Sequence, residues 1–191
     1  MIKIGITGGI GSGKTVISTL LELMDIPVYI ADEESKALTD KSPTIREKLI
    51  HLFGSSIYTP KGLNKKLLAS HIFNNQEYLK QVNAIIHPEV NQHFLEWSSK
   101  LPNNICAIES AILFESGFDK IVDISLMVYA PMELRIERVM KRGVATREEI
   151  INRIQSQLSD DIKKEKADYI ILNDDKHALI PQLQTFLNTL Y

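Results

Sequence analysis

The chain has 191 residues and a formal net charge of −2, from 22 Lys and Arg against 24 Asp and Glu, which suits one globular domain with a sizeable insertion. The near-neutral charge excludes a broad nucleic-acid-binding surface, which is ordinarily basic, and no run approaches the ~18 apolar residues of a membrane span. We therefore expect a cytoplasmic protein with neither nucleic-acid nor membrane partners.

A predicted strand at residues 2–7 opens the chain, because β-branched and polar residues alternate there. From Val16 onward, apolar residues at helical spacing predict a helix. Between these elements the sequence matches the pattern G-x-x-x-x-G-K-[ST]. The matching residues are Gly8, Gly9, Ile10, Gly11, Ser12, Gly13, Lys14 and Thr15.

This octapeptide is typical of a loop that binds the phosphates of a nucleoside triphosphate. Its glycines let the backbone turn so that several N–H groups, including those of Ser12 and Val16, can face phosphate oxygens. The following helix adds its positive N-terminal end. We expect Lys14 to reach the β- and γ-phosphates and the Thr15 hydroxyl to bind Mg²⁺.

Asp32 comes directly after a second predicted strand, at residues 28–30. In a parallel sheet the carboxyl ends of strands face the ligand crevice, so this carboxylate is placed to orient or deprotonate an acceptor hydroxyl. It is equally suited to cap the N-terminus of the helix that follows. The spacing alone leaves both interpretations open.

The segment at residues 33–100 shows several helical patterns and no convincing strand. It is too long for a simple crossover helix, so we expect an inserted helical subdomain that recognises the substrate. Within it, Pro88 predicts the start of a helix that ends near Trp97.

A third strand, predicted at residues 105–108, contains the single cysteine, Cys106. One cysteine permits no disulfide within the chain, which suits a reducing compartment, and we expect it to pack in the core. Glu109 ends this strand. It is a candidate to hold Mg²⁺ through water or to polarise the attacking hydroxyl, with a solvated loop carboxylate as the alternative.

Two further strands, at residues 124–129 and 169–172, and an amphipathic helix at residues 179–190 complete the pattern. Helical segments separate the strands. This order predicts an α/β fold with a parallel sheet flanked by helices.

Five of the six arginines lie between Arg135 and Arg153. Arg135, Arg138 and Arg142 fall at i, i+3 and i+7, which places them on one face of a helix, with Met132, Ile136, Val139 and Met140 on another. Gly143 interrupts that helix and Arg147 opens the next. Arginine forms forked contacts with phosphates, so we expect a lid over residues 138–153 rather than a solvated charged face.

The phosphate-binding pattern alone does not define the reaction. A switch GTPase should offer N-K-x-D, whereas the nearest string, residues 173–176, has the order N-D-D-K. A motor domain ordinarily needs a longer chain. A small-molecule kinase fits, and a nucleoside or nucleoside monophosphate kinase remains an alternative. So does a P-loop regulatory protein, which needs no acceptor base.

From Ile4 to the final helix, the chain resembles the dephospho-coenzyme A kinase family. The signature T-G-G-I-G-S-G-K stands at residues 7–14, and the family's D-A-D string becomes Ile30-Ala31-Asp32. The family's H-P string is His87-Pro88. Further strings match at residues 111–115, 146–148, 153–157 and 167–173. Two departures are Ala111 for the usual Pro and Lys65 for the usual Arg.

The resemblance implies a P-loop kinase fold with a core at residues 1–32 and 101–191, a coenzyme A-binding insertion at 33–100 and an arginine-rich lid. It implies transfer of the ATP γ-phosphoryl group to the ribose 3′-hydroxyl of dephospho-coenzyme A. The products are coenzyme A and ADP, in the last step of coenzyme A biosynthesis. A monomer or weak homo-oligomer is expected.

The residue roles follow from the same resemblance. Asp32 is expected to orient or deprotonate the hydroxyl, while Lys14, Mg²⁺ on Thr15, and Arg138 and Arg142 balance the developing charge. Arg142 and Asn173 are also assigned to ATP. The residues assigned to dephospho-coenzyme A, besides Asp32, are Lys65, His87, Glu109 and Arg147.

Overall fold

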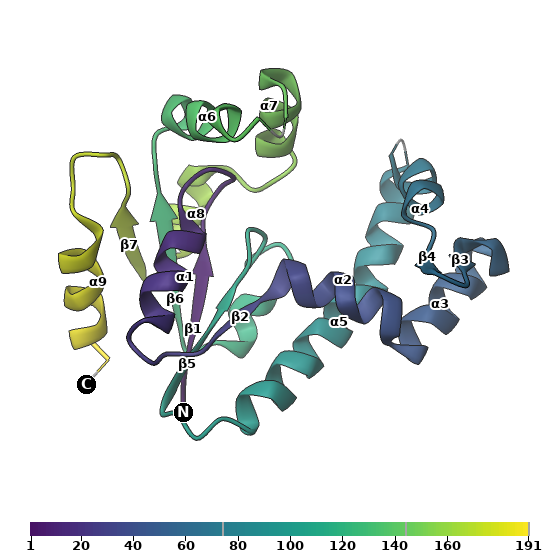
Figure 1. The fold of residues 1–191 in the computed structure, drawn as a ribbon, viewed down its shortest axis with the longest axis horizontal. Coiled ribbons are helices and arrows are strands. Elements are labelled where there is room, and N and C mark those ends of the chain that lie inside the picture. The colour runs from purple at the N-terminus through teal and green to yellow at the C-terminus, as the bar shows by residue number, and fades with distance from the viewer. Residues whose placement is uncertain (74, 144, 191) are drawn as a thin grey trace. The chain divides into compact units, whose positions relative to one another are not determined.

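The computed structural model describes residues 1–73, 75–143 and 145–190 (Figure 1). The chain divides into two compact units, one formed by Met1–Ile30 with Pro102–Tyr191 and the other by Ala31–Leu101. None of the helices in the described ranges is long and apolar enough to span a membrane.

The first unit is built on a parallel sheet with the strand order β2-β5-β1-β6-β7 (Figure 1). Its strands confirm the five predicted ones: β1 (Ile2–Thr7), β2 (Val28–Ile30), β5 (Ile105–Glu109), β6 (Ile124–Tyr129) and β7 (Tyr169–Leu172). All five residues of β5 are buried, as expected where helices cover both faces of a parallel sheet. All strands therefore end at one edge, and β1, the central strand, leads there into the glycine-rich loop.

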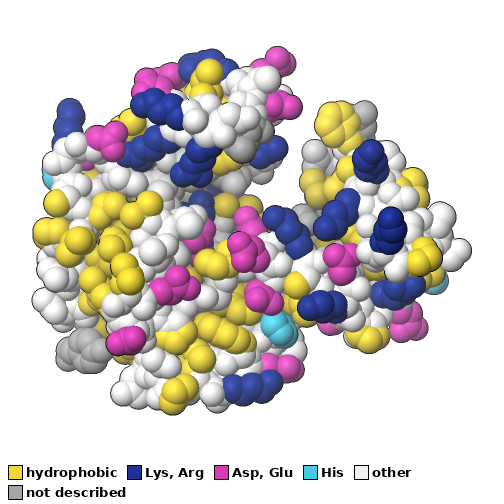
Figure 2. Space-filling view, viewed as in Figure 1, with side chains coloured by type: hydrophobic (Ala, Val, Ile, Leu, Met, Phe, Trp, Pro, Cys, Tyr) yellow, Lys and Arg dark blue, Asp and Glu magenta, His cyan; other side chains and the backbone are white. Residues whose placement is uncertain are grey.

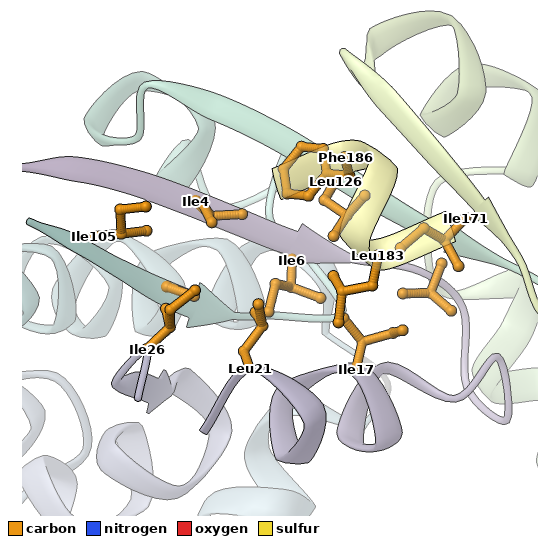
Figure 3. Close-up of a cluster of buried hydrophobic side chains, with 12 residues drawn as sticks. Ile4, Ile6, Ile17, Leu21, Ile26, Ile105, Leu126, Ile171, Leu183 and Phe186 are labelled. Carbon is orange, nitrogen blue, oxygen red and sulfur yellow. The ribbon is translucent and has the colours of Figure 1, made fainter. Parts of the chain in front are cut away.

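Five α-helices and a short 3-10 helix, η2 (Phe118–Ile121), accompany this sheet in the described ranges. The α-helices are α1 (Lys14–Glu22), α6 (Met132–Lys141), α7 (Arg147–Gln155), α8 (Asp160–Lys166) and α9 (Leu179–Asn188). Figure 3 shows the main core, where Ile4 and Ile6 of β1 meet Ile17 of α1 and Leu183 and Phe186 of α9. Burying each such side chain stabilises the fold by about 1.5–3 kcal/mol. This packing anchors α1 to the sheet directly after the glycine-rich loop.

The second unit is mainly helical. Its elements are α2 (Ala31–Lys41), α3 (Pro43–Phe53), the 3-10 helix η1 (Ser55–Ile57), β3 (Tyr58–Thr59), β4 (Gly62–Leu63), α4 (Lys65–Ile72) and α5 (Gln76–Ser99). Strands β3 and β4 pair antiparallel, which corrects the expectation of no strand. Two residues per strand are too few for an alternating pattern to be recognised. A separate core forms here around Ile45, Leu49 and Val82.

Helix α5 runs unbroken through Pro88, so the predicted helix start at that residue is wrong. The true start is capped by Asn75, whose side chain accepts hydrogen bonds from the backbone N–H groups of Glu77 and Tyr78. A proline inside a helix costs about 3 kcal/mol. Val82 before Pro88 and Phe94 after it are buried, and burial of about 1.5–3 kcal/mol for each such side chain offsets this cost.

Candidate active site

The glycine-rich loop between β1 and α1 has the backbone shape that its sequence predicts. Gly11 and Gly13 have φ angles of 78° and 99°, in the left-handed region that favours glycine. The loop is closed by a 3.1 Å hydrogen bond from the Ser12 N–H to the Gly9 carbonyl. Lys14 donates to the Gly8 carbonyl at 2.9 Å, so its ammonium lies across the loop. With the N-terminus of α1 behind it, this loop forms a cradle for an anion.

Asn173, which directly follows β7, joins this loop to helix α6. Its side-chain amide donates to the Ser12 carbonyl at 2.7 Å. Arg138 of α6 donates to the Asn173 carbonyl at 3.0 Å and to its side-chain oxygen at 3.3 Å, and also pairs with Asp175. Three residues predicted at the site, Ser12, Arg138 and Asn173, are therefore brought together.

Arg142 follows the last turn of α6 and is exposed. Together with Thr15, Val16 and Thr19 of α1 it lines a cavity of about 360 Å³. Figure 2 shows several basic side chains, drawn dark blue, over α6 and α7, with acidic side chains among them. The structure therefore places Arg142 beside the helix whose N-terminus faces the phosphate-binding loop.

Arg135 is a correction to the expected lid face. It is only 2% exposed, and its guanidinium pairs with Asp160 of α8 at 2.5 Å, next to Gly9 of the glycine-rich loop. Of the apolar face predicted opposite, Ile136 and Val139 are buried. The methionines of that face, Met132 and Met140, are each 46% exposed.

Glu109 ends β5 with 9% exposure and accepts a 2.6 Å hydrogen bond from the Ser18 hydroxyl of α1. The alternative of a solvated loop carboxylate is therefore wrong. Ser18 lies three residues after Thr15, and residues with this spacing are neighbours on a helix surface. The Thr15 hydroxyl and the Glu109 carboxylate are thus both associated with the first turns of α1, and both offer the oxygen ligands that Mg²⁺ prefers.

Helix α7 begins at Arg147, and its N-terminus is capped by neighbouring residues. Thr146 and Glu149 form a capping box, and hydrogen bonding from the Thr146 backbone holds the pKa of Glu149 below its usual value. Arg147 donates from Nη2 to both carboxylate oxygens of Glu133 of α6, at 2.7 and 2.9 Å. The predicted lid, residues 138–153, includes Val144, which lies outside the described residues.

The remaining predicted residues belong to the second unit and are described within it. Asp32 is the second residue of α2 and is exposed, so it sits in the first helical turn and not before it as an N-cap would. Lys65 begins α4, with its ammonium 3.9 Å from the Asp40 carboxylate. His87 lies inside α5, where burial lowers its pKa and favours the neutral imidazole.

Sequence reasoning missed three charged residues that organise the first unit: Asp160, Asp175 and Lys163. Lys163 is fully buried and donates to the Ala111 carbonyl at 2.7 Å, with Glu115 at 3.2 Å. Each of these residues meets a partner far away in the chain. No spacing pattern signals such contacts; an acidic residue such as Asp160 signals only the start of a helix.

Comparisons with known proteins give a consistent result. A family model described as dephospho-CoA kinase matches residues 2–178. A dephospho-CoA kinase from Bacteroides fragilis is 52% identical over 191 residues, which cover 100% of this chain and 93% of that protein. One from Porphyromonas gingivalis is 45% identical over 190 residues, covering 99% and 94%. The crystal structure of TT1252 from Thermus thermophilus is similar with a TM-score of 0.83 at 32% identity, covering 99% of this chain and 95% of that one.

Proposed function

Because the chain belongs to the dephospho-CoA kinase family, it phosphorylates dephospho-coenzyme A with ATP in coenzyme A biosynthesis, and we propose how its residues perform this reaction. The γ-phosphoryl group passes to the ribose 3′-hydroxyl, giving coenzyme A and ADP. The observation that supports the site best is the preformed loop of residues 8–13, joined through Asn173 to the lid arginine Arg138.

ATP binds with its phosphates in this loop. The backbone N–H groups of residues 8–16 and the N-terminus of α1 receive the phosphate oxygens. Lys14 exchanges its contacts with the Gly8 and Gly9 carbonyls for the β- and γ-phosphates. This exchange is favourable because a hydrogen bond between two charged groups is stronger than one to a neutral carbonyl. Asn173 and Arg142 flank the rest of the nucleotide.

Asp32 orients the acceptor hydroxyl and takes its proton. Its carboxylate is exposed and comes two residues after the end of β2, at the edge where parallel strands present ligand-binding residues. A general base typically contributes about 10²- to 10⁴-fold to the rate. The neutral form of His87 is suited to a hydrogen bond with dephospho-coenzyme A, and Lys65 and Arg147 supply positive charge for its phosphates.

Arg138 and Arg142 stabilise the charge that develops on the transferred phosphoryl group. Arg138 already lies against the phosphate-binding loop through Asn173, while Arg142 lines the cavity beside Thr15. Phosphoryl transfer demands mainly charge placement and in-line geometry, and a positioned arginine is suited to both. Closure of the lid would also exclude water from the γ-phosphate and limit hydrolysis of ATP.

The donor set also fits Mg²⁺, a hard cation that prefers oxygen ligands. The Thr15 hydroxyl would hold it directly and Glu109 through water. When bound, Mg²⁺ neutralises charge on the β- and γ-phosphates. Ser18 keeps the Glu109 carboxylate fixed at the end of β5 by its 2.6 Å hydrogen bond.

A coupled ADP-release assay with dephospho-coenzyme A, adenosine and AMP as competing acceptors tests this function. We expect only dephospho-coenzyme A to stimulate release strongly. Stimulation by adenosine or AMP alone would assign the chain to another class of small-molecule kinase. A rate of ADP release that none of the three acceptors changes would indicate a P-loop regulatory protein.

A further inference from the structure

The Arg135 side chain lies against the phosphate-binding loop and not on the open surface of helix α6. Its side chain is 2% exposed, and its guanidinium donates to Asp160 at 2.5 Å. Figure 1 shows the loop after β1 passing directly under α6, the helix that carries Arg135. One of the five clustered arginines is therefore removed from the surface that meets solvent and ligands.

Gly9 of the loop faces this guanidinium. A Cβ atom added to Gly9 would collide with Nη1 of Arg135 and lie 3.5 Å from Oδ1 of Asp160. Gly8, Gly11 and Gly13 have positive φ angles, but Gly9 does not. The φ angle of Gly9 is therefore not one that requires glycine. What leaves no room for a side chain there is the Arg135 guanidinium, which Asp160 holds in place.

Gly11 makes a second contact with the same residue. A Cβ atom on Gly11 would lie 2.5 Å from the backbone oxygen of Arg135 and 3.0 Å from Cγ2 of Val139. Helix α6 thus touches the loop at two glycines, with the Arg135 side chain at one and its backbone at the other. These two contacts hold the loop against α6.

The ion pair is poorly explained as a device for stability. Replacing a buried ion pair by apolar residues is often neutral or stabilising. In addition, Nε of Arg135 is buried without a hydrogen-bond partner among the described residues, which carries its own cost. A local cost of this kind is typical of residues that serve a functional site.

Asp160 is held in place from its own helix. Ser159 caps α8 by accepting a hydrogen bond from the Ile162 N–H at 3.3 Å. Three residues after Asp160, the buried Lys163 fixes α8 to the Ala111 carbonyl. The carboxylate that orients Arg135 therefore sits on an anchored element.

We propose that Arg135, oriented by Asp160, is a positioning residue that supports the loop at Gly9 and so keeps its N–H groups aligned on the ATP phosphates. This inference rests on the proposed role of the loop in ATP binding. Loss of the Arg135 side chain should weaken the binding of the ATP phosphates and leave the recognition of adenosine and of dephospho-coenzyme A unchanged.

The test measures kcat, the KM values for ATP and dephospho-coenzyme A, and the binding of ATP and adenosine by calorimetry. Arg135→Gln, which removes the guanidinium, should raise the KM for ATP about 10-fold, because small misplacements at such sites are costly. The KM for dephospho-coenzyme A and the binding of adenosine should stay within about two-fold. Arg135→Lys, which keeps the charge, should recover part of the loss. Arg46→Gln, the same change on α3, is the matched control and should leave ATP binding unchanged.

The contact with Gly9 gives a sharper test. Gly9→Ala should weaken ATP binding strongly when Arg135 is present, and the double variant Gly9→Ala/Arg135→Gln should bind ATP no more weakly than Arg135→Gln alone. If the double variant is as poor as Gly9→Ala, or if Arg135→Gln leaves the KM for ATP unchanged, the proposal is wrong.

The variant Arg135→Met/Asp160→Leu distinguishes loss of the positioning role from a folding defect. It replaces the ion pair by apolar side chains and should remain folded. A folded double variant with a raised KM for ATP supports the positioning role, whereas a normal KM overturns it. Failure of the proposed function itself is distinct, since the unmodified protein would then neither bind ATP nor release ADP with dephospho-coenzyme A.

Discussion

The side-chain amide of Asn173 donates a 2.7 Å hydrogen bond to the backbone carbonyl of Ser12, which joins the last strand of the sheet to the phosphate-binding loop. The same amide occupies the space next to Gly13, where a Cβ atom would collide with it. Gly13, the residue just before α1, is thus in contact with the end of β7. The shape of the loop depends on a residue 161 positions away in the chain.

Asn173→Ala should raise the KM for ATP about 10-fold, because it removes the bond to Ser12 and one acceptor for Arg138. Each hydrogen bond of this kind is worth about 0.5–1.5 kcal/mol. Steady-state kinetics at saturating dephospho-coenzyme A measure the effect. Asn103→Ala is the control, since it removes a 2.9 Å bond to the Asp25 carbonyl outside the loop. Equal KM values for ATP in both variants would remove Asn173 from the ATP site.

Asp32→Asn should lower kcat by about 10²- to 10⁴-fold, as expected for loss of a general base, while the affinity for ATP is unchanged. Calorimetry measures ATP binding and the coupled assay measures turnover. Glu33→Gln is the matched control, because Glu33 is also exposed in the first turn of α2. Normal turnover in Asp32→Asn would show that Asp32 takes no part in the reaction.

Arg142→Ala should lower kcat more than it raises the KM for dephospho-coenzyme A, because its proposed charge acts on the transferred phosphoryl group. Arg142→Lys should retain part of the rate, since it keeps the charge but loses the forked geometry. The comparison requires full kinetics with each substrate varied in turn. A change confined to the KM for dephospho-coenzyme A would instead assign Arg142 to the acceptor.

Lys163→Met should lower the free energy of unfolding by about 1–3 kcal/mol, because it leaves the Ala111 carbonyl without its hydrogen-bond donor and the Glu115 carboxylate without its cation. Urea unfolding measures this loss. Lys163→Met/Glu115→Leu removes both charges and should recover part of the stability. A single variant as stable as the unmodified protein would mean that the contacts of the buried Lys163 ammonium contribute nothing to the fold.

Asp174 makes stability sensitive to acid. Its carboxylate binds the His177 side chain and accepts backbone N–H groups, and the His177 hydrogen bond is the main reason that the pKa of Asp174 falls to about 2. A carboxyl whose pKa is lower in the folded state stabilises above its unfolded value of 3.8, and this contribution is lost as the pH falls toward 2.

Acid titration of stability in the unmodified protein and in Asp174→Asn checks this expectation. The difference between the two proteins should shrink between pH 4 and pH 2. A constant difference across that window would contradict the assignment.

The sequence alone predicted the five parallel strands and the position of the glycine-rich loop, because local residue patterns indicate both. Residues 124–129 and 169–172 alternate or run apolar over a single strand, and the glycines of residues 8–13 are needed where the chain must turn. The helix through Pro88 was missed because burial on both sides of the proline outweighs its local preference. The short β3-β4 hairpin is too brief to leave a pattern.

The site was only partly predictable for a related reason. Helical spacing correctly placed Arg135 and Arg138 in one helix, which ends just before Arg142, but spacing does not reveal which residues each side chain contacts. Arg135 is buried because Asp160, 25 residues later, supplies its counter-charge. Contacts between distant residues are decided by the packing of complete elements, and a single sequence carries little information about them.

The contact between Gly9 and Arg135 also constrains the order in which substitutions can accumulate during evolution. A lineage that acquires a larger residue at position 9 first must tolerate a collision with the guanidinium, whereas one that first shortens position 135 opens the space. The second order of substitutions avoids the collision and is therefore the one that we expect. Within descendants of this protein, the residue at position 135 should therefore change before glycine is lost at position 9.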